Sequence, residues 1–269
     1  MKKLLIYLLF ILLLSSCGKV ITISNKQIIP QDFTNKISKY STYKDEYLNY
    51  YYYTYLDYPN KTYIEILNYV NYPSFYDFSK PAKALNINGL LLVNRKFYLE
   101  EDYYPSNLVS ITGVNYVKRE NEVMMINEDV LKAYKEMEIF AKQKNINFTI
   151  FSSFRSYQKQ LSLWNPSRPA SDKFLAKPGF SEHQTGLVLD ISTLDKGLTI
   201  HFEDSPSFNF LESNAHKFGF ILRYPKGKEH ITGYAYEPWH YRYVGKEVAY
   251  IIWKEKLTLE EYFYKYLLL

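Results

Sequence analysis

The chain has 269 residues, of which 47% are hydrophobic and 18% aromatic, and its 33 basic and 28 acidic residues give a formal net charge of +5. This length allows one large domain, or a domain with an extension, and is sufficient to bury a core. The small basic excess gives no reason to expect nucleic acid as a partner, and a single cysteine excludes a disulfide within the chain.

The first sixteen residues have the pattern of a secretory signal. Two lysines precede an apolar run from Leu4 to Leu14, and two serines stand directly before Cys17. The run is too short to cross a bilayer, which needs ~20 apolar residues in a helix. The arrangement resembles the lipobox of bacterial lipoproteins, although an ordinary signal peptide that happens to contain a cysteine is the alternative. We expect residues 1–16 to be removed and Cys17 to carry a lipid that anchors the protein outside the cell membrane.

Residues 17–85 form a segment rich in tyrosine, asparagine and lysine, which we expect to be a helical extension. Bulky aromatic residues disfavour disorder. Residues 44–58 and 63–72 have the pattern of short helices, interrupted by Pro59-Asn60 and closed by Pro73. We expect the tyrosines to pack this extension against the main domain, and a carbohydrate-binding or wall-binding surface is the alternative.

Residues 86–269 alternate between strand and helix patterns without a regular repeat, which predicts an α+β fold. Strands are expected at 90–93, 147–152, 187–191, 220–223 and 239–243. Helices are expected at 127–145, 156–164, 208–218 and, as one or two segments, 246–268.

Two stretches about fifty residues apart contain the residues most suited to catalysis. His183, Asp190 and His240 provide two imidazoles and a carboxylate, a ligand set that suits zinc. Three protein ligands leave an open fourth position, which distinguishes a catalytic zinc from a structural one. Positions 183 and 190 would lie on opposite faces of a regular strand, but Gly186 can provide a turn between them.

Glu237 stands three residues before His240, in the sequence Glu-Pro-Trp-His. A zinc hydrolase needs a base that takes a proton from the attacking water and returns it to the leaving group. A carboxylate that does not bind the metal can serve, so Glu237 is the predicted base. Pro238 restricts the backbone beside it, and Trp239 provides a bulky wall.

The motifs resemble those of the zinc D-alanyl-D-alanine carboxypeptidases of the VanY type, whose close relatives include L,D-carboxypeptidases. The resemblance rests on Ser-x-His-x-x-Gly-x-x-x-Asp at 181–190, Glu-Pro-Trp-His at 237–240 and Ser-Phe-Arg-Ser at 153–156, and it covers about residues 90–265. It implies a single zinc on His183, Asp190 and His240, with Glu237 as base. It also implies a Hedgehog/D,D-peptidase-like domain, with a small, mostly antiparallel sheet flanked by helices.

The resemblance further places Arg155 where it binds the substrate's terminal carboxylate or polarises the scissile carbonyl. The planar, permanently charged guanidinium suits a carboxylate. Other positions that match substrate-contacting residues are Ser152, Gln160, Ser181 and Tyr224. Where many relatives have Gly-Tyr, this chain has Ser153-Phe154, which affects the shape of the pocket rather than the chemistry.

The resemblance and the predicted lipid anchor together predict a monomeric, cell-surface zinc carboxypeptidase. Its substrates would be peptidoglycan stem peptides, from which it would release the last D-alanine. Within the enzyme class, the alternatives are L,D-specificity on tetrapeptide stems and endopeptidase cleavage of cross-links. From a different class, the alternative is a wall-binding lipoprotein that keeps the fold and the metal but has no activity.

Overall fold

The computed structural model describes residues 29–268, except for residues 72–79, 121, 166 and 168–173. The expected signal at 1–16 and the expected lipid-bearing Cys17 lie outside the described residues, so both stay predictions. Within the described part of the chain, no helix combines the length and the apolar character that a membrane crossing requires.

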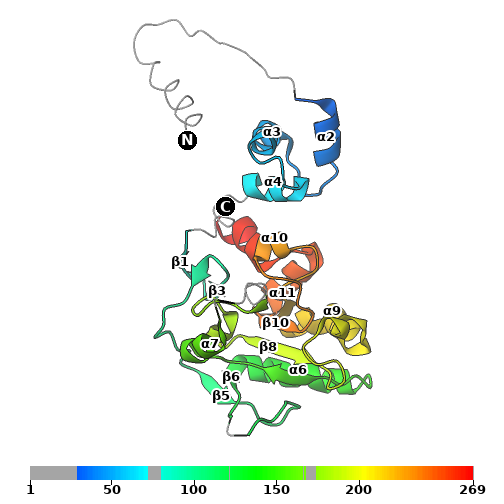
Figure 1. Cartoon of the computed structure of the whole chain (residues 1–269). Coiled ribbons are helices and arrows are strands. Elements are labelled where there is room, and N and C mark those ends of the chain that lie inside the picture. Colours follow the sequence, from blue (N-terminus) through cyan, green and yellow to red (C-terminus); the bar gives the residue numbers. More distant parts are fainter. Residues whose placement is uncertain (1–28, 72–79, 121, 166, 168–173, 269) are drawn as a thin grey trace, which may run out of the picture.

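The N-terminal extension is a cluster of three short helices with a small core of its own (Figure 1). The helices are α2 (Gln31–Ile37), α3 (Leu48–Asp57, preceded by the 3-10 turn η1, Asp45–Tyr47) and α4 (Tyr63–Asn71). The buried apolar residues of this core are Phe33, Ile37, Tyr51, Ile66 and Leu67. Phe33 contacts three tyrosine rings at centroid distances of 5.1–5.6 Å. Among the described residues of this segment the aromatic rings pack on one another, and Tyr43 also lines a cavity together with Lys256 and Tyr264 of the main domain.

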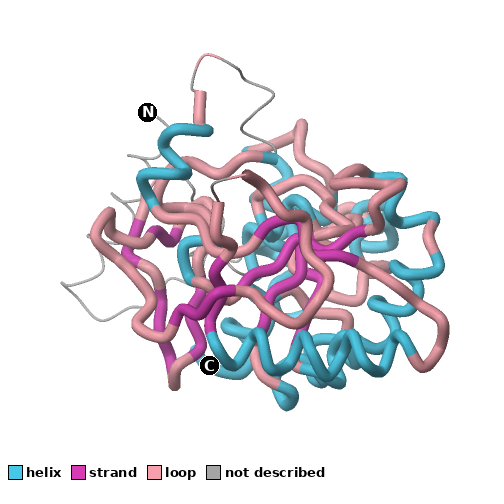
Figure 2. The backbone as a smooth tube through the Cα atoms, turned by 90° about the horizontal axis from the view of Figure 1, so that it is seen from below, coloured by secondary structure: helices cyan, strands magenta, loops and turns pink. Residues whose placement is uncertain are grey.

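The centre of the main domain is a four-stranded antiparallel sheet with the strand order β7-β8-β10-β9. Its strands are β7 (Thr149–Ser152), β8 (Val188–Ser192), β9 (Phe220–Leu222) and β10 (His240–Tyr243). Every residue of β8 is buried, as the apolar sequence of this strand predicts. Figure 2 shows the strands crossing the middle of the molecule, with helices along one side. This arrangement confirms the predicted α+β class.

Helix α6 (Glu128–Lys142) packs beside the sheet and contributes the largest share of the main core (Figure 1). The helix begins at Asn127, whose side chain accepts hydrogen bonds from the backbone N–H groups of Asp129 and Val130. Apolar residues recur at helical spacing and are buried together with Leu189 and Ile191 of β8; they are Val130, Leu131, Ala133, Tyr134, Met137 and Ala141. This packing fixes the strand that provides the central carboxylate of the site.

Three short strand pairs lie at the edge of the domain, and of their six strands only β3 was predicted. They are β1 (Ala82–Lys83) with β4 (Phe97–Tyr98), β2 (Leu85–Ile87) with β3 (Leu90–Leu92), and β5 (Leu108–Ser110) with β6 (Met125–Asn127). Asn88 and Gly89 both have positive φ angles and connect β2 to β3, as a two-residue hairpin requires. Among the described residues, strand pairing in this part of the chain begins at Ala82, and the expected start of the main domain at residue 86 stays a prediction.

The remaining elements surround the sheet and complete a second apolar cluster. They are α7 (Tyr157–Leu163), η2 (Glu182–Thr185), η3 (Ile200–Asp204), α9 (Pro206–Asn214), η4 (Ala215–Phe218), α10 (Glu229–Thr232), α11 (Lys246–Glu255), α12 (Leu259–Tyr262) and the π-helix η5 (Phe263–Leu268). Helices α11 and α12 pack on Leu92, Phe97 and Ile221, which ties the C-terminal part to the edge strands.

Candidate active site

The sheet register brings two predicted ligands together. Asp190 of β8 and His240, the first residue of β10, are directly paired across the two antiparallel strands. Such cross-strand pairs point to the same face of a sheet and have Cβ atoms about 4.5–5.5 Å apart. Asp190 Oδ1 lies 3.3 Å from His240 Nδ1. Residues fifty positions apart in the sequence therefore meet because of strand pairing.

The third predicted ligand, His183, reaches the same point from the 3-10 turn η2. This turn ends at Gly186, which has a φ of +69° and turns the chain into β8. A side chain at this position would be strained by the positive φ, and its Cβ atom would lie 2.8 Å from Leu108 Cδ2, which would have to shift. The turn predicted at Gly186 is confirmed, and it explains how positions 183 and 190 converge without sharing a strand.

The chemistry of the three ligands fits a cation. His183 Nδ1 lies 2.6 Å from the carbonyl oxygen of Ser153 and must donate to it, so a neutral imidazole has its lone pair on Nε2. That lone pair faces Asp190 Oδ2 at 3.3 Å, and the other carboxylate oxygen is buried without a hydrogen-bond partner among the described residues. One ligand atom each from His183, Asp190 and His240 can be chosen so that all lie within 4.8 Å of one another. Acceptors that face one another in a buried space are what a bound zinc ion requires.

Charge in the site is set by burial and by these neighbours. Burial opposes ionisation of Asp190, but His183 and His240 outweigh it and hold the pKa of this carboxyl well below its usual value. Burial also lowers the pKa of His183, and Asp190 only partly opposes this effect. A negative carboxylate beside a neutral imidazole is the protonation state that a metal ion needs in its ligands.

Glu237, the predicted base, lies beside the ligands. Its Oε2 is 3.4 Å from His240 Nδ1, and its backbone N–H donates to the carbonyl of Tyr224 at 3.2 Å. Burial raises the pKa of the Glu237 carboxyl, and the neighbouring His240 opposes that shift. A raised pKa brings a carboxyl closer to the range in which it can both accept and return a proton near neutral pH.

Arg155 lines the same cavity, and Gln160 holds its guanidinium group. Arg155 Nη1 donates to Gln160 Oε1 at 2.9 Å, while Gln160 Nε2 donates to the carbonyl of Ala176 at 2.6 Å. Gln160 itself is only 1% exposed and does not line the cavity. The geometry thus makes Gln160 a support for Arg155, whereas the sequence led us to expect direct contact with substrate.

The cavity around these residues has a volume of about 220 Å³. Ser181 and Tyr224 line it as expected, and the ring of Tyr224 lies 4.6 Å from that of His240. Ser152 is paired with Asp190 at a bulge in β7 but does not line the cavity. Lining residues that the sequence analysis missed are Phe174, Leu175, Ala176, Glu182, Leu198 and Tyr234.

A buried ion-pair network lies behind the site and was also missed. Glu182 Oε1 accepts a hydrogen bond from Arg242 Nη1 at 2.7 Å and forms an ion pair with Arg223, whose Nε lies 2.9 Å away. Arg223 also binds both oxygens of Glu260, at 2.6 and 2.9 Å. All four side chains are at most 2% exposed. Two features of the sequence could have indicated this network. Glu182 stands beside His183 in the first motif, and the two arginines stand in or next to apolar strand segments.

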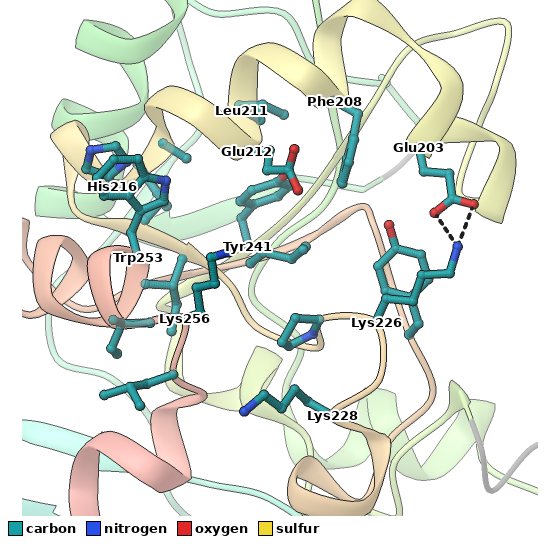
Figure 3. Close-up of a pocket in the computed structure, with 18 residues that line it drawn as sticks. Glu203, Phe208, Leu211, Glu212, His216, Lys226, Lys228, Tyr241, Trp253 and Lys256 are labelled. Atoms are coloured by element: carbon teal, nitrogen blue, oxygen red, sulfur yellow. Dashed lines mark hydrogen bonds and ion pairs between the residues drawn. The ribbon is translucent and has the colours of Figure 1, made fainter. Parts of the chain in front are cut away.

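A second cavity, of about 470 Å³, lies behind β10 and is larger than the first (Figure 3). Tyr241 lines it, whereas the preceding residue, His240, lines the cavity of the ligands. His216 stacks on Trp253 at a centroid distance of 3.9 Å, and Lys226 pairs with Glu203. None of the predicted site residues lines this larger cavity. The smaller cavity is therefore the candidate active site, because it contains the ligands, the base and the arginine.

The fold and the site define an α+β domain with a buried cluster that can hold a metal ion, beside a glutamate and an arginine that suit hydrolysis. A family model described as VanY, D-alanyl-D-alanine carboxypeptidase, matches residues 123–246. The chain belongs to this family. It is 40% identical over 186 residues to YodJ of Bacillus subtilis strain 168, which is provisionally named a carboxypeptidase; the match covers 66% of this chain and 68% of that protein. It is 32% identical over 185 residues to VanXYC of Enterococcus gallinarum, named a bifunctional D-Ala-D-Ala dipeptidase and carboxypeptidase, with coverage of 65% and 94%.

Solved structures of an L,D-carboxypeptidase and of a D,D-peptidase share this fold. The LD-carboxypeptidase LdcB, whose structure is described as revealing peptidoglycan recognition, is 37% identical, with a TM-score of 0.60 and coverage of 71% of this chain and 97% of that one. A D,D-pentapeptidase VanY from a VanB-type vancomycin-resistance cassette, solved with Zn(II), is 30% identical, with a TM-score of 0.52 and coverage of 64% and 96%. The Zn(II) in a relative agrees with the cluster of His183, Asp190 and His240 found in this chain.

Proposed function

We propose that this protein is a zinc carboxypeptidase that releases the C-terminal D-alanine from peptidoglycan stem peptides at the cell surface. The observation that carries the proposal is the position of Arg155. Its guanidinium lines the same small cavity as the three ligands and Glu237. A fixed cation beside a hydrolytic centre suits a substrate with a free terminal carboxylate, and hence an exopeptidase.

His183, Asp190 and His240 would hold one zinc ion. When bound, zinc polarises a carbonyl oxygen and lowers the pKa of water. The protein's own contribution is to keep these ligands buried and correctly oriented. The Ser153 carbonyl fixes the tautomer of His183, and strand pairing fixes Asp190 against His240.

Glu237 would move the protons of the reaction. Its carboxylate takes a proton from the attacking water and returns it to the amino group of the leaving D-alanine. Its hydrogen bond to the Tyr224 backbone and its burial hold it beside the ligands. General acid–base catalysis of this kind contributes about 10²–10⁴-fold to the rate.

Arg155, Ser181 and Tyr224 would position the substrate. Arg155, oriented by Gln160, would bind the terminal carboxylate in a two-pronged contact. Tyr224 lines the cavity beside His240, and burial keeps its pKa well above the usual value, so its hydroxyl stays protonated. A protonated hydroxyl at this place can donate to the oxygen on which negative charge develops.

L,D-carboxypeptidase activity on tetrapeptide stems is the second candidate. It is favoured by the likeness to LdcB, which exceeds that to the D,D-pentapeptidase in both identity and TM-score. The two activities share the ligands, the base and the arginine, and differ in the configuration of the residue before the scissile bond. Phe174 and Leu198, which line the cavity, are candidate walls for that residue.

One experiment separates these functions. Purified protein, with and without a zinc chelator, is incubated with a pentapeptide ending in D-Ala-D-Ala and with the tetrapeptide that lacks the last residue, and the products are identified by mass. Release of D-alanine from the pentapeptide alone supports the main proposal, and release from the tetrapeptide supports L,D-specificity. Release from neither stem, by protein that binds zinc and peptidoglycan, would contradict both and support a wall-binding role.

The surface location rests on the sequence pattern before Cys17. A lipid on this cysteine would hold the catalytic domain outside the membrane, with the helical extension between them. Replacement by Cys17→Ser should move the protein from the membrane fraction to the soluble fraction. Firm membrane attachment of this variant would contradict lipid anchoring.

A further inference from the structure

The two oxygens of the Glu182 carboxylate have different surroundings. Oε1 accepts a hydrogen bond from Arg242 at 2.7 Å and forms an ion pair with Arg223, whose Nε lies 2.9 Å away. Oε2 is buried and has no hydrogen-bond partner among the described residues. It lies 3.7 Å from His240 Nε2, which is also buried and has no hydrogen-bond partner there. A buried acceptor and a buried ring nitrogen thus face each other, each without another partner.

The other nitrogen of His240 faces the ligand cluster. Its Nδ1 lies 3.3 Å from Asp190 Oδ1 and 3.4 Å from Glu237 Oε2. A neutral imidazole has one N–H and one lone pair. If Nδ1 binds a metal ion, the proton must be on Nε2, where it points at Glu182. His183 uses the opposite arrangement, in which Nδ1 donates to a backbone carbonyl and Nε2 faces the cluster.

We propose that Glu182 is a positioning residue that fixes the tautomer and orientation of His240 by accepting the Nε2–H of its ring. The inference rests on the proposed metal site, in which His240 is a ligand. Partners behind a metal-binding histidine orient the ring and raise its basicity, and their loss costs about 10–100-fold in metal affinity.

The arginines explain why a carboxylate can occupy this buried place. Burial alone would raise the pKa of Glu182, but Arg223 and Arg242 outweigh it and hold the pKa far below the usual value. Glu182 alone could balance only one of the two arginine charges. Glu260 balances the other, because Arg223 donates to both of its carboxylate oxygens. The network therefore contains two acidic and two basic groups, and it fixes Oε1 so that Oε2 is directed at His240.

The substitution Glu182→Gln gives a sharp test because of the same arginines. Arg242 donates a hydrogen bond to the Oε1 position and the Arg223 guanidinium lies 2.9 Å from it, so the amide oxygen is expected to occupy this position and the amide NH₂ to face His240 Nε2. A donor opposite Nε2 favours the tautomer with the lone pair on Nε2 and the proton on Nδ1. We expect zinc affinity, measured by competition with a chromophoric chelator, to fall about 10–100-fold.

Glu260→Gln is the matched control. It removes a carboxylate from the same buried network, but Glu260 bonds to Arg223 and Asn94, away from the ligands. It should lower thermal stability and leave zinc affinity within about threefold of the wild type. Equal zinc affinity in Glu182→Gln and the wild type, or equal losses in both variants, would overturn the role of Glu182. Failure of the wild type to bind zinc would instead contradict the proposed function.

A measurement on the wild-type protein covers the case in which Glu182→Gln does not fold. In zinc-loaded protein with ¹⁵N-labelled histidine, the expected spectrum shows His240 with a protonated Nε2 and an unprotonated, metal-shifted Nδ1. The Nε2 proton should exchange slowly with water, because it is buried and hydrogen-bonded. A His240 spectrum with a metal-shifted Nε2, or with a rapidly exchanging Nε2 proton, would contradict the proposal.

Discussion

Asp190 and His240 are paired across β8 and β10, with the carboxylate Oδ1 3.3 Å from the imidazole Nδ1. This pairing makes the sheet itself the frame of the site, because a one-residue slip between the strands would turn one of the two side chains to the other face. His183 and Glu237 are then placed by turns at the ends of the same two strands.

Removal of the base should separate metal binding from catalysis. In Glu237→Gln the three ligands are intact, so zinc binding should stay within about threefold of the wild type. D-Alanine release should fall about 10²–10⁴-fold, the range typical of a lost general acid–base group. Zinc content by elemental analysis and kcat from product release check the two parts. Undiminished turnover would contradict the role of Glu237.

The same substitution should raise the stability of the metal-free protein. The pKa of Glu237 is raised in the folded state, mainly by burial, so this carboxyl favours folding below its unfolded pKa of ~4.3 and progressively loses that contribution as the pH rises through the folded value. At pH 7 metal-free Glu237→Gln should therefore unfold at a higher temperature than the wild type. The difference should shrink as the pH falls towards 4. A destabilised variant at pH 7 would show that the buried charge is better compensated than we infer.

Loss of the guanidinium should weaken recognition of the terminal carboxylate. Arg155→Lys retains a charge but cannot form the two-pronged contact or the same bond to Gln160, so kcat/KM should fall about 10–100-fold, equivalent to ~1.5–3 kcal/mol for hydrogen bonds to a charged group. Steady-state kinetics on a stem peptide check this expectation. A stem peptide amidated at its C-terminus is the control, and it should be a poor substrate for both proteins. If the wild type processes the amide as well as the acid, Arg155 does not bind the terminal carboxylate.

The turn before β8 should tolerate only glycine. Gly186→Ala adds a Cβ atom 2.8 Å from Leu108 Cδ2 at a φ of +69°, which should cost about 1–3 kcal/mol and lower zinc affinity by displacing His183. Gly197→Ala is the matched control, because Gly197 also has a positive φ of +59° but has no atom within 4 Å of the added methyl group. Thermal unfolding and zinc titration of both variants check the difference. Equal losses would mean that backbone strain alone, and not the close approach to Leu108, determines the cost.

Several parts of the site could be predicted from local sequence. The apolar run around Asp190 indicates a buried strand that carries a carboxylate, and Gly186 indicates the turn before it. The set of two histidines, an aspartate and a spare glutamate indicates zinc hydrolysis by ligand chemistry alone. The two-residue strands β1 and β4 are too short to show a period-two pattern, and they were missed for that reason.

Sequence determined the residue types of this site and the motifs that identify the family. Tertiary structure alone decided which atoms meet: Asp190 with His240 through strand register, Gln160 with Arg155 instead of with the cavity, and Glu182 behind His240 between two buried arginines. These relationships depend on register and on side-chain direction, which no local pattern encodes. A residue type states what chemistry a side chain can perform, and the fold determines which partner it reaches.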